Sequence, residues 1–456
     1  MMTIVSIIIP LQFIAIAAYL LFKHYHPQSV LLLCGLAMMC VAIALGFGIP
    51  DLEESTGLAF FDLFRRLKES MVGRVSGVGL MIMAIGGFVA YMKKIGASEV
   101  LVYISMQPLA FFKRYPYVAT ILVIPIGQLL FICTPSATGL GLLLVASIYP
   151  VLVGLGVSRV SAVSVISACT VFDMGPASAN TARASELIGK SNVAYFIENQ
   201  LALAIPLTLM LMALYYFVNR YFDRKEHVKA ETFKREEFKT DVPLVYALLP
   251  VLPLILLIVF SRFVQLSPEN PIILETTTAT FIALFVAFAF ELIRKRRVKE
   301  VFASLKTFWE GMGKVFASVI TLIVAAEIFS GGLISLGFID GLVDISRDMG
   351  FGAIGIGILM TVIIFLASLL MGSGNASFFS FGPLVPDIAT RLGANASEMI
   401  LPMQLSSSMG RAVSPISGVV VAISEVAEVS PFDLAKRNLI PLCATLVFML
   451  VYHFFF

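Results

Sequence analysis

Arg411 is a positive charge within a long apolar segment, three residues before Ser414 and a proline that interrupts the helical pattern. An arginine at the centre of a membrane helix costs about 2.5–3.5 kcal/mol on insertion scales, so it needs a partner or a function. A guanidinium can hold a carboxylate through two parallel hydrogen bonds. The half-helix that resumes after a break adds open N–H donors and a partial positive charge. The pattern predicts an anion site at Arg411, with Ser417 beside it.

A second segment, residues 160–188, carries a similar break at Gly175 and the proline that follows. Arg183 beyond this break is a further candidate anion-binding group, together with two small polar residues, Ser178 and Asn180. The opposite ends of broken helices offer carbonyl oxygens to a cation. We therefore expect a coupling ion near Asp173, Gly175 and Ser414. Asp173 could instead carry a proton, meet an amino group of the substrate, or simply neutralise Arg411.

Two small polar triplets lie within long runs that contain no charged residue, 115–158 and 349–386. Irregular backbone within a membrane is tolerated only where protein or a water-filled cavity satisfies it. We expect both runs to form re-entrant hairpins with the triplets at their tips, although each run is long enough to cross twice. Ser, Thr and Asn side chains can donate hydrogen bonds to a carboxylate or bind Na⁺ through their oxygens, and they are poor ligands for soft metals. The tip triplets are Ser136-Ala137-Thr138 and Ser373-Gly374-Asn375, with possible Na⁺ ligands at Ser136, Thr138, Ser373 and Asn375.

The two halves of the chain repeat these features at a nearly constant spacing. Ser178, Glu186 and Ser191 recur 239 residues later as Ser417, Glu425 and Ser430, and the tip triplets are 237 residues apart. Polar groups at corresponding places in apolar segments are typical of secondary transporters with a substrate site at the repeat interface. We expect the matched Glu186 and Glu425 to cap helix ends. Glu327, whose counterpart is the apolar Gly86, is a further candidate for protonation.

The composition indicates a polytopic α-helical membrane protein. Hydrophobic residues make up 59% of the chain and charged residues 13%, with a mean hydropathy of +0.95. A crossing needs about 20 apolar residues. We expect the first apolar stretch, 4–22, to be such a span and not a cleaved signal peptide. The basic and aromatic surface pattern of a nucleic-acid binder is missing, and no cofactor motif is present. The expected crossings are 4–22, 28–48, 76–92, 160–188 and 193–218, then 243–261, 272–292, 315–335, 398–426 and 432–454, with amphipathic interfacial segments at 54–70 and 301–314.

These crossings predict two five-helix halves, 1–222 and 242–456, joined by a charged cytoplasmic linker, 223–241. Each half then holds one re-entrant hairpin and one broken helix, 160–188 or 398–426. An odd number of crossings inverts the second half relative to the first. With the linker in the cytoplasm, most lysines and arginines outside the membrane are cytoplasmic, as the positive-inside rule requires. Two full crossings in each hairpin would make the halves parallel instead.

Four motifs give the chain a resemblance to a known family. They are IGGFVAYMKKIGA from Ile85, SATGLGLLL from Ser136, MGSGNA from Met371 and GRAVSPISGVVVA from Gly410. Along nearly its whole length the chain resembles the anaerobic C4-dicarboxylate carriers of the DcuC family, within the ion transporter superfamily. The resemblance implies carriage of fumarate, succinate, malate or aspartate across the bacterial inner membrane. It also implies a homodimer whose transport domain moves against a scaffold by an elevator motion, with a coupling cation and no cofactor.

The resemblance leaves the coupling ion and the substrate open. Superfamily members that use Na⁺ often carry Ser-Asn-Thr at both tips, and the tips here depart from that pattern, which favours H⁺. The charge around Asp173 would also suit an amino-bearing substrate. An amino-acid or other organic-anion carrier and an obligate dicarboxylate exchanger are therefore the alternatives. A channel would need a continuous polar path, and an enzyme would need a nucleophile with its base or a metal cluster.

Overall fold

The computed structural model describes residues 2–456 except 50, 51, 53, 109–114, 226–240, 262, 265–271 and 351. Within these residues every regular element is a helix, and ten helices are long and apolar enough to cross a membrane. The expectation of an all-helical polytopic protein is confirmed. The expected linker, 223–241, lies almost wholly outside the described residues.

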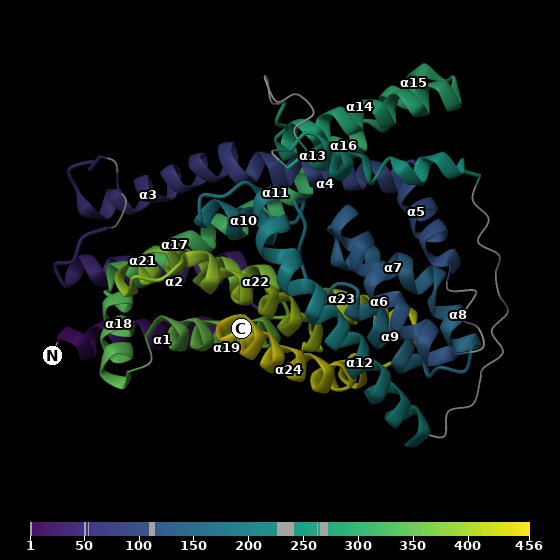
Figure 1. The fold of residues 1–456 in the computed structure, drawn as a ribbon. Coiled ribbons are helices and arrows are strands. Elements are labelled where there is room, and N and C mark those ends of the chain that lie inside the picture. The colour runs from purple at the N-terminus through teal and green to yellow at the C-terminus, as the bar shows by residue number, and fades with distance from the viewer. Residues whose placement is uncertain are drawn as a thin grey trace.

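The first half consists of helices of very different lengths (Figure 1). They are α1 Met2–Phe22, α2 Pro27–Ala44, α3 Ala59–Arg74, η1 Val75–Gly79, α4 Leu80–Lys94, α5 Ala97–Met106, α6 Pro116–Cys133, α7 Ala137–Ser147, α8 Tyr149–Gly154, α9 Arg159–Ala168, α10 Ala179–Leu187, α11 Asn192–Tyr195, η3 Phe196–Gln200 and α12 Leu201–Lys225.

The second half presents a similar order of elements. They are η4 Leu244–Leu248, α13 Leu252–Val259, α14 Thr276–Lys295, α15 Val298–Ser304, α16 Lys306–Val315, η5 Phe316–Ile320, α17 Thr321–Ser335, α18 Phe338–Met349, α19 Gly352–Met371, α20 Gly374–Phe381, η6 Gly382–Leu384, α21 Val385–Leu392, α22 Ala396–Val413, α23 Gly418–Val426 and α24 Pro431–Phe455.

Two very long helical segments, Ala59–Lys94 and Val298–Ser335, run antiparallel through the molecule. The π-turns η1 and η5 lie 241 residues apart and meet where the segments cross; α3 packs on α17 and α4 packs on α16. The segments 54–70 and 301–314, expected as separate interfacial helices, are largely continuous with the crossings that follow them. At η1 the backbone of Gly77 leaves the helical conformation (φ −89°, ψ −115°), so α3 and α4 meet at a kink near the expected boundary. At η5 the π-turn adds a residue without ending the helix, so α16 continues into α17 where the sequence pattern suggested a boundary.

The segment expected to cross at 243–261 does not form one helix. It divides into the 3₁₀ turn η4 and the eight-residue α13, and it is not among the ten candidate spans. Pro250 lies between η4 and α13 and accounts for the division, because a proline lacks the N–H that a helix interior requires, whereas Pro253 is in the first turn of α13, where proline is tolerated. Hydropathy predicted one crossing helix here, and the structure does not form one of that length.

The segments expected as broken helices consist of helix pairs. α9 ends at Ala168 and α10 begins at Ala179, whereas α22 ends at Val413 and α23 begins at Gly418. α10 and α23 both have nine residues and start 239 residues apart. In Figure 1, α6 to α9, α12, α23 and α24 lie together on the right, below the long helix that contains α4.

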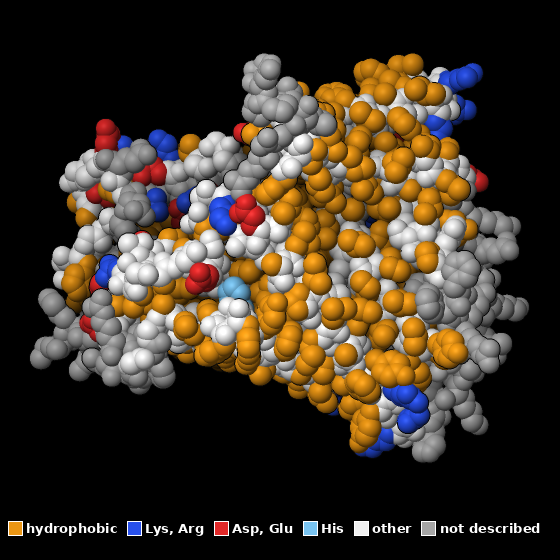
Figure 2. Space-filling view, viewed as in Figure 1, with side chains coloured by type: hydrophobic (Ala, Val, Ile, Leu, Met, Phe, Trp, Pro, Cys, Tyr) orange, Lys and Arg blue, Asp and Glu red, His pale blue; other side chains and the backbone are white. Residues whose placement is uncertain are grey.

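Apolar side chains cover much of the outer surface, as a lipid environment requires. Figure 2 shows a continuous hydrophobic area across the middle and right of one face, whereas charged side chains gather toward the ends. The exposed large hydrophobic residues of the protein include Leu209, Phe217 and Val447, each more than 60% exposed. Their exposure would be costly in water, so the surface indicates contact with lipid.

The close packing of α2 on α17 generates a stability prediction. A Cβ added at Gly35 would lie 2.6 Å from the backbone of Ile328, whereas one at Gly73 would meet nothing within 4 Å. We expect Gly35→Ala to lower the free energy of unfolding by about 1–3 kcal/mol, since overpacking forces helices apart. Gly73→Ala is the control and should not lower the thermal unfolding temperature in detergent. Equal unfolding temperatures for both variants would contradict this packing.

Candidate functional site

The two hairpin turns and the two helix breaks lie together. A Cβ at Gly175, in the first break, would lie 2.8 Å from Ile132 at the end of α6. A Cβ at Gly372, before the second turn, would lie 3.1 Å from Ile416 in the second break. Contacts also cross between the halves, because α7 packs on α23 and α20 packs on α10. The structure thus brings all four sequence-predicted regions into one place.

Buried amide side chains satisfy the backbone at the first break. The Gly175 N–H donates to Gln200 Oε1 at 3.0 Å, and Gln404 Nε2 donates to the Asp173 carbonyl at 2.9 Å. The Tyr195 hydroxyl and Gln200 Nε2 both donate to Gln404 Oε1, at 2.9 and 3.1 Å. Both glutamines are fully buried. The first break is therefore closed by protein groups, and its freed Gly175 N–H is already engaged.

Sequence reasoning missed Gln200 and Gln404. Each is an uncharged polar residue in an apolar segment, and such a residue needs hydrogen-bond partners when it is buried. That was the available signal, but nothing in the spacing indicated that residues 204 positions apart would meet. Gln404 comes from α22, the helix that leads to the second break, so it connects the two halves directly.

The Asp173 carboxylate points at the start of α10. Asn180 Nδ2 donates to Asp173 Oδ2 at 3.1 Å, and Ser178 Oγ accepts from the N–H groups of Asn180 and Thr181. Ser178 is thus the N-cap of α10. Asn180 Oδ1 is buried and has no hydrogen-bond partner. The cluster has one unused acceptor, and the Asp173 carboxylate itself can accept further donors.

Arg411 connects the two breaks and keeps part of its guanidinium unused. Its Nη2 donates to the Thr170 carbonyl at 2.6 Å, whereas its Nε is buried without a partner. The charges of Arg411 and Asp173 attract each other, but no atoms of the two groups form an ion pair within 4 Å. Arg411 is therefore not a direct ion-pair partner of Asp173 in this structure.

Unused hydroxyl groups lie in the same part of the chain. Ser408, Ser414 and Ser417 are each buried, and none of their Oγ atoms has a hydrogen-bond partner. Ser417 precedes α23 but does not bond to the N–H groups of that helix. Buried polar atoms are normally paired, so this group around the second break is suited to receive a polar ligand.

The tip serines cap their own helices. Ser136 Oγ accepts from the Gly139 N–H and Ser373 Oγ accepts from the Ala376 N–H, both at 3.3 Å. Thr138 is exposed, while Ala137 and Asn375 are partly buried. A Cβ at Gly374 would lie 2.8 Å from the Ser407 carbonyl, so this position needs a glycine for packing against α22. The freely available tip groups are the side chains of Thr138 and Asn375.

Arg183 lies in a different cluster from Arg411. Its Nη1 donates to Glu186 Oε2 at 2.6 Å, and Glu186 also pairs with Arg74. Glu186 therefore forms ion pairs and does not cap its helix, whereas the repeat-matched Glu425 is exposed and forms no ion pair with the described residues. Glu327, a candidate for protonation by sequence, is paired with two arginines in this same cluster.

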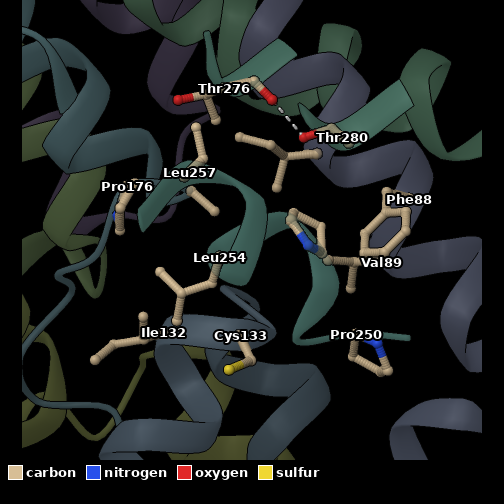
Figure 3. A pocket seen from close by; sticks show the side chains of 13 residues that line it. Phe88, Val89, Ile132, Cys133, Pro176, Pro250, Leu254, Leu257, Thr276 and Thr280 are labelled. Atoms are coloured by element: carbon tan, nitrogen blue, oxygen red, sulfur yellow. Dashed lines mark hydrogen bonds between the residues drawn. The ribbon is translucent and has the colours of Figure 1, made fainter. Parts of the chain in front are cut away.

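A neighbouring cavity is apolar. Figure 3 shows Ile132 and Cys133 at the first tip facing Leu254, Leu257 and Phe88 across it. The hydroxyl of Thr280, also on its wall, is engaged with the Thr276 carbonyl at 2.7 Å. The lining carries no charged side chain and is otherwise apolar apart from the Thr276 hydroxyl and Cys133, so the cavity does not match the predicted anion site.

Known proteins similar to this chain match it along nearly its whole length. The family model described as C4-dicarboxylate anaerobic carrier matches residues 4–455. The anaerobic C4-dicarboxylate transporter DcuC of Escherichia coli K12 is 32% identical over 452 residues, covering 99% of this chain and 96% of that protein. The probable anaerobic C4-dicarboxylate transporter DcuC of Vibrio cholerae is 34% identical over 435 residues, covering 95% and 94%.

Two solved structures share the fold. The YdaH transporter of Alcanivorax borkumensis aligns with a TM-score of 0.62 at 15% identity, covering 94% of this chain and 98% of that one. MtrF of Neisseria gonorrhoeae, from a class of antimetabolite efflux pumps, aligns with a TM-score of 0.61 at 11% identity, covering 94% and 95%. At these identities the likeness concerns the fold alone.

The hydrogen-bond network of Gln200 and Gln404 predicts that substituting Gln404 lowers the stability of the protein more than substituting Gln128. Gln404→Leu removes the donor to the Asp173 carbonyl and the acceptor for Tyr195 and Gln200, and each stranded buried group costs about 1–3 kcal/mol. We expect this variant to lower the thermal unfolding temperature in detergent markedly. Gln128→Leu is the matched control, because Gln128 Nε2 is already unpaired and its Oε1 accepts only from Thr208. A Gln404→Leu variant as stable as the control would contradict the role of the network.

Proposed function

The chain belongs to the DcuC family of anaerobic C4-dicarboxylate carriers, and on this premise we propose that it is a secondary active transporter of C4-dicarboxylates. The proposed substrates are succinate, fumarate and malate, with aspartate as a further candidate, carried across the bacterial inner membrane. One observation carries the site assignment: Arg411 has an unpaired, buried Nε in the region of three buried serine hydroxyls without partners. A transporter is not an enzyme, so the chemistry required of the site is reversible binding.

Arg411 is the proposed anchor for one substrate carboxylate. A guanidinium presents donors in a plane that matches two carboxylate oxygens. Ser414 and Ser417 would donate their hydroxyl protons to the same carboxylate. The N-terminus of α23, which follows Ser417, adds partial positive charge. Asn180, beyond the first break, would turn its amide toward the ligand.

The hairpin tips would hold the second carboxylate. The N-termini of α7 and α20 begin at these tips, and helix N-termini attract anions. Thr138 and Asn375 have side chains free for this contact, whereas Ser136 and Ser373 cap the helices and keep those N-termini in place. A dicarboxylate would then have Arg411 and the second break for one carboxylate and the two tips for the other.

The substrate site would open to the two faces of the membrane in turn. The hairpins and broken helices would move against the long helices to bring this about. The matched lengths and spacings of α4 with α17 and of α10 with α23 support two structurally related halves. In inverted-repeat carriers the site lies between such halves, and one part moves against the other around it. We propose an elevator motion of this kind, in a homodimer whose scaffold contains the two long helical segments.

A coupling cation completes the proposal. Asp173 is a buried acid next to the breaks, and a proton on it would alter the charge facing Arg411. Na⁺ at the tips remains the other possibility, because hydroxyl and carbonyl oxygens suit hard cations. A coupling of about 1–3 kcal/mol between cation and substrate would change affinity 5–150-fold.

Substitution of Arg411 tests the assignment. Arg411→Lys keeps the charge but loses the planar fork, so we expect succinate affinity to fall about 10–100-fold, as for loss of a charged hydrogen bond. Binding is measured by titration calorimetry on purified protein, and uptake is measured in proteoliposomes. Arg220→Lys on α12 is the matched control, since Arg220 contacts Tyr216 and not the breaks. Unchanged succinate binding in folded Arg411→Lys and Arg411→Ala would overturn the site.

The same proteoliposomes distinguish the alternative functions. An imposed pH gradient should drive succinate accumulation in wild type, and a Na⁺ gradient should do so if Na⁺ is the coupling ion. Accumulation only against internal dicarboxylate would identify an obligate exchanger. Preference for amino acids or other organic anions over all C4-dicarboxylates would contradict the proposed substrate class.

A further inference from the structure

Five charged side chains from three helices form a cluster apart from the proposed substrate site. Arg66 and Arg74 extend from α3, Glu327 from α17, and Arg183 and Glu186 from α10. Arg74 Nη2 lies 3.0 Å from Glu327 Oε1, and Arg66 Nη2 lies 3.3 Å from the same oxygen. Arg74 also pairs with Glu186, so one arginine joins two carboxylates on different helices.

The cluster connects a long helix to a half-helix of the broken pair. Arg74 is the last residue of α3 before the π-turn η1, and α10 packs against that turn. α10 itself begins at Ser178, directly after the first break. The side chains of Glu327 and Arg183 are 9% and 2% exposed, whereas those of Arg74 and Glu186 are 26% and 30% exposed. The partly exposed Arg74–Glu186 ion pair joins α10 to the crossing of the long helices, and the buried Glu327 carboxylate holds Arg74 in position for it.

The second half does not reproduce the cluster. At the spacing of 241 residues that relates η1 to η5, Arg74 corresponds to Val315 and Glu327 corresponds to Gly86. These two counterparts touch, because a Cβ at Gly86 would lie 2.2 Å from Val315 Cγ2. A tight apolar contact thus occupies the place of an ion pair, and the connection to a half-helix exists on one side only.

Two charged residues of the second half lie at or beside the sequence positions that match the cluster. Glu425 on α23 is the counterpart of Glu186, and Lys314 is the direct neighbour of Val315. Both are exposed, and across the described part of the chain neither has an oppositely charged atom within 4 Å. α23 packs on α7, α9 and α24 in this arrangement, whereas α10 packs on η1.

We propose that the cluster is a latch for one end state and that Glu425 pairs with Lys314 in the opposite end state. This inference rests on the proposed function, in which related halves alternate. When inverted repeats exchange conformations, α23 approaches η5 as α10 now approaches η1. Glu425 then reaches the end of α16, where Lys314 is the available cation. The two latches differ in strength: one is a partly buried network of five charges, and the other is a single exposed pair, which is worth little on its own.

Paired cysteines test the latch in a parent protein whose five natural cysteines have been replaced. One variant carries Arg74→Cys with Glu186→Cys, and the other carries Lys314→Cys with Glu425→Cys. A short bifunctional methanethiosulfonate reagent is applied to each in proteoliposomes. We expect both pairs to cross-link, and either cross-link to stop succinate uptake until a reductant is added. Failure of the Lys314 and Glu425 pair to cross-link, while the Arg74 and Glu186 pair does, overturns the proposal.

Charge removal gives an independent measurement that keeps the half-helix packing intact. Glu186→Gln in the Lys314→Cys with Glu425→Cys background should raise the cross-linking rate at least threefold, since the first latch no longer opposes the transition. Glu300→Gln is the matched control, because Glu300 forms only an exposed pair with Arg297, remote from the cluster. Equal rates in both variants overturn the latch. Absence of succinate uptake by the uncross-linked parent contradicts the proposed function instead, and the cross-linking rates still decide the latch.

Discussion

A helix that breaks inside a membrane must have its freed backbone groups satisfied by the protein, and the arrangement of this molecule depends on that requirement. The Gln200 and Gln404 side chains meet it at the first break, where they bind the Gly175 N–H and the Asp173 carbonyl. Because Gln404 comes from the helix of the second break, the same hydrogen bonds fix the two halves against each other. The geometry at Asp173 and Asn180 follows from this connection.

The two breaks differ in how completely their polar groups are used. At the second break, Asn438 Nδ2 donates to the Ala412 carbonyl at 2.9 Å, but the hydroxyls of Ser414 and Ser417 have no partner. Arg411 extends from this break to the Thr170 carbonyl and retains an unused Nε. The first break is thus mainly a structural joint, and the second holds the donors that an anion requires. This division explains why related halves can serve one asymmetric substrate site.

The sequence predicted the helix breaks and the hairpin turns because glycine, proline and small polar residues act locally. The repeat spacing then identified which of these features correspond. Side-chain partners were harder to predict, because they come from distant helices: Arg183 was expected at the substrate, but it lies against Glu186 in a cluster with Arg74. Continuity of α16 into α17 was also missed, since the π-turn η5 changes the periodicity without ending the helix. Pro250 within 243–261 was outweighed by hydropathy, although it lies where that segment divides.

We propose above all that both hairpin tips contact one substrate. Because the second half is expected to be inverted relative to the first, the two tips should open to opposite faces of the membrane. The most direct test of this proposal is orientation-resolved labelling of Thr138→Cys and Asn375→Cys, each in a cysteine-free parent, with an impermeant thiol reagent. Both positions carry side chains without the packing constraint of Gly374. The account predicts labelling of the two cysteines from opposite faces of the membrane, and slower labelling of both when succinate is present. Labelling of both from the same face, or rates unaffected by succinate at either position, would contradict it.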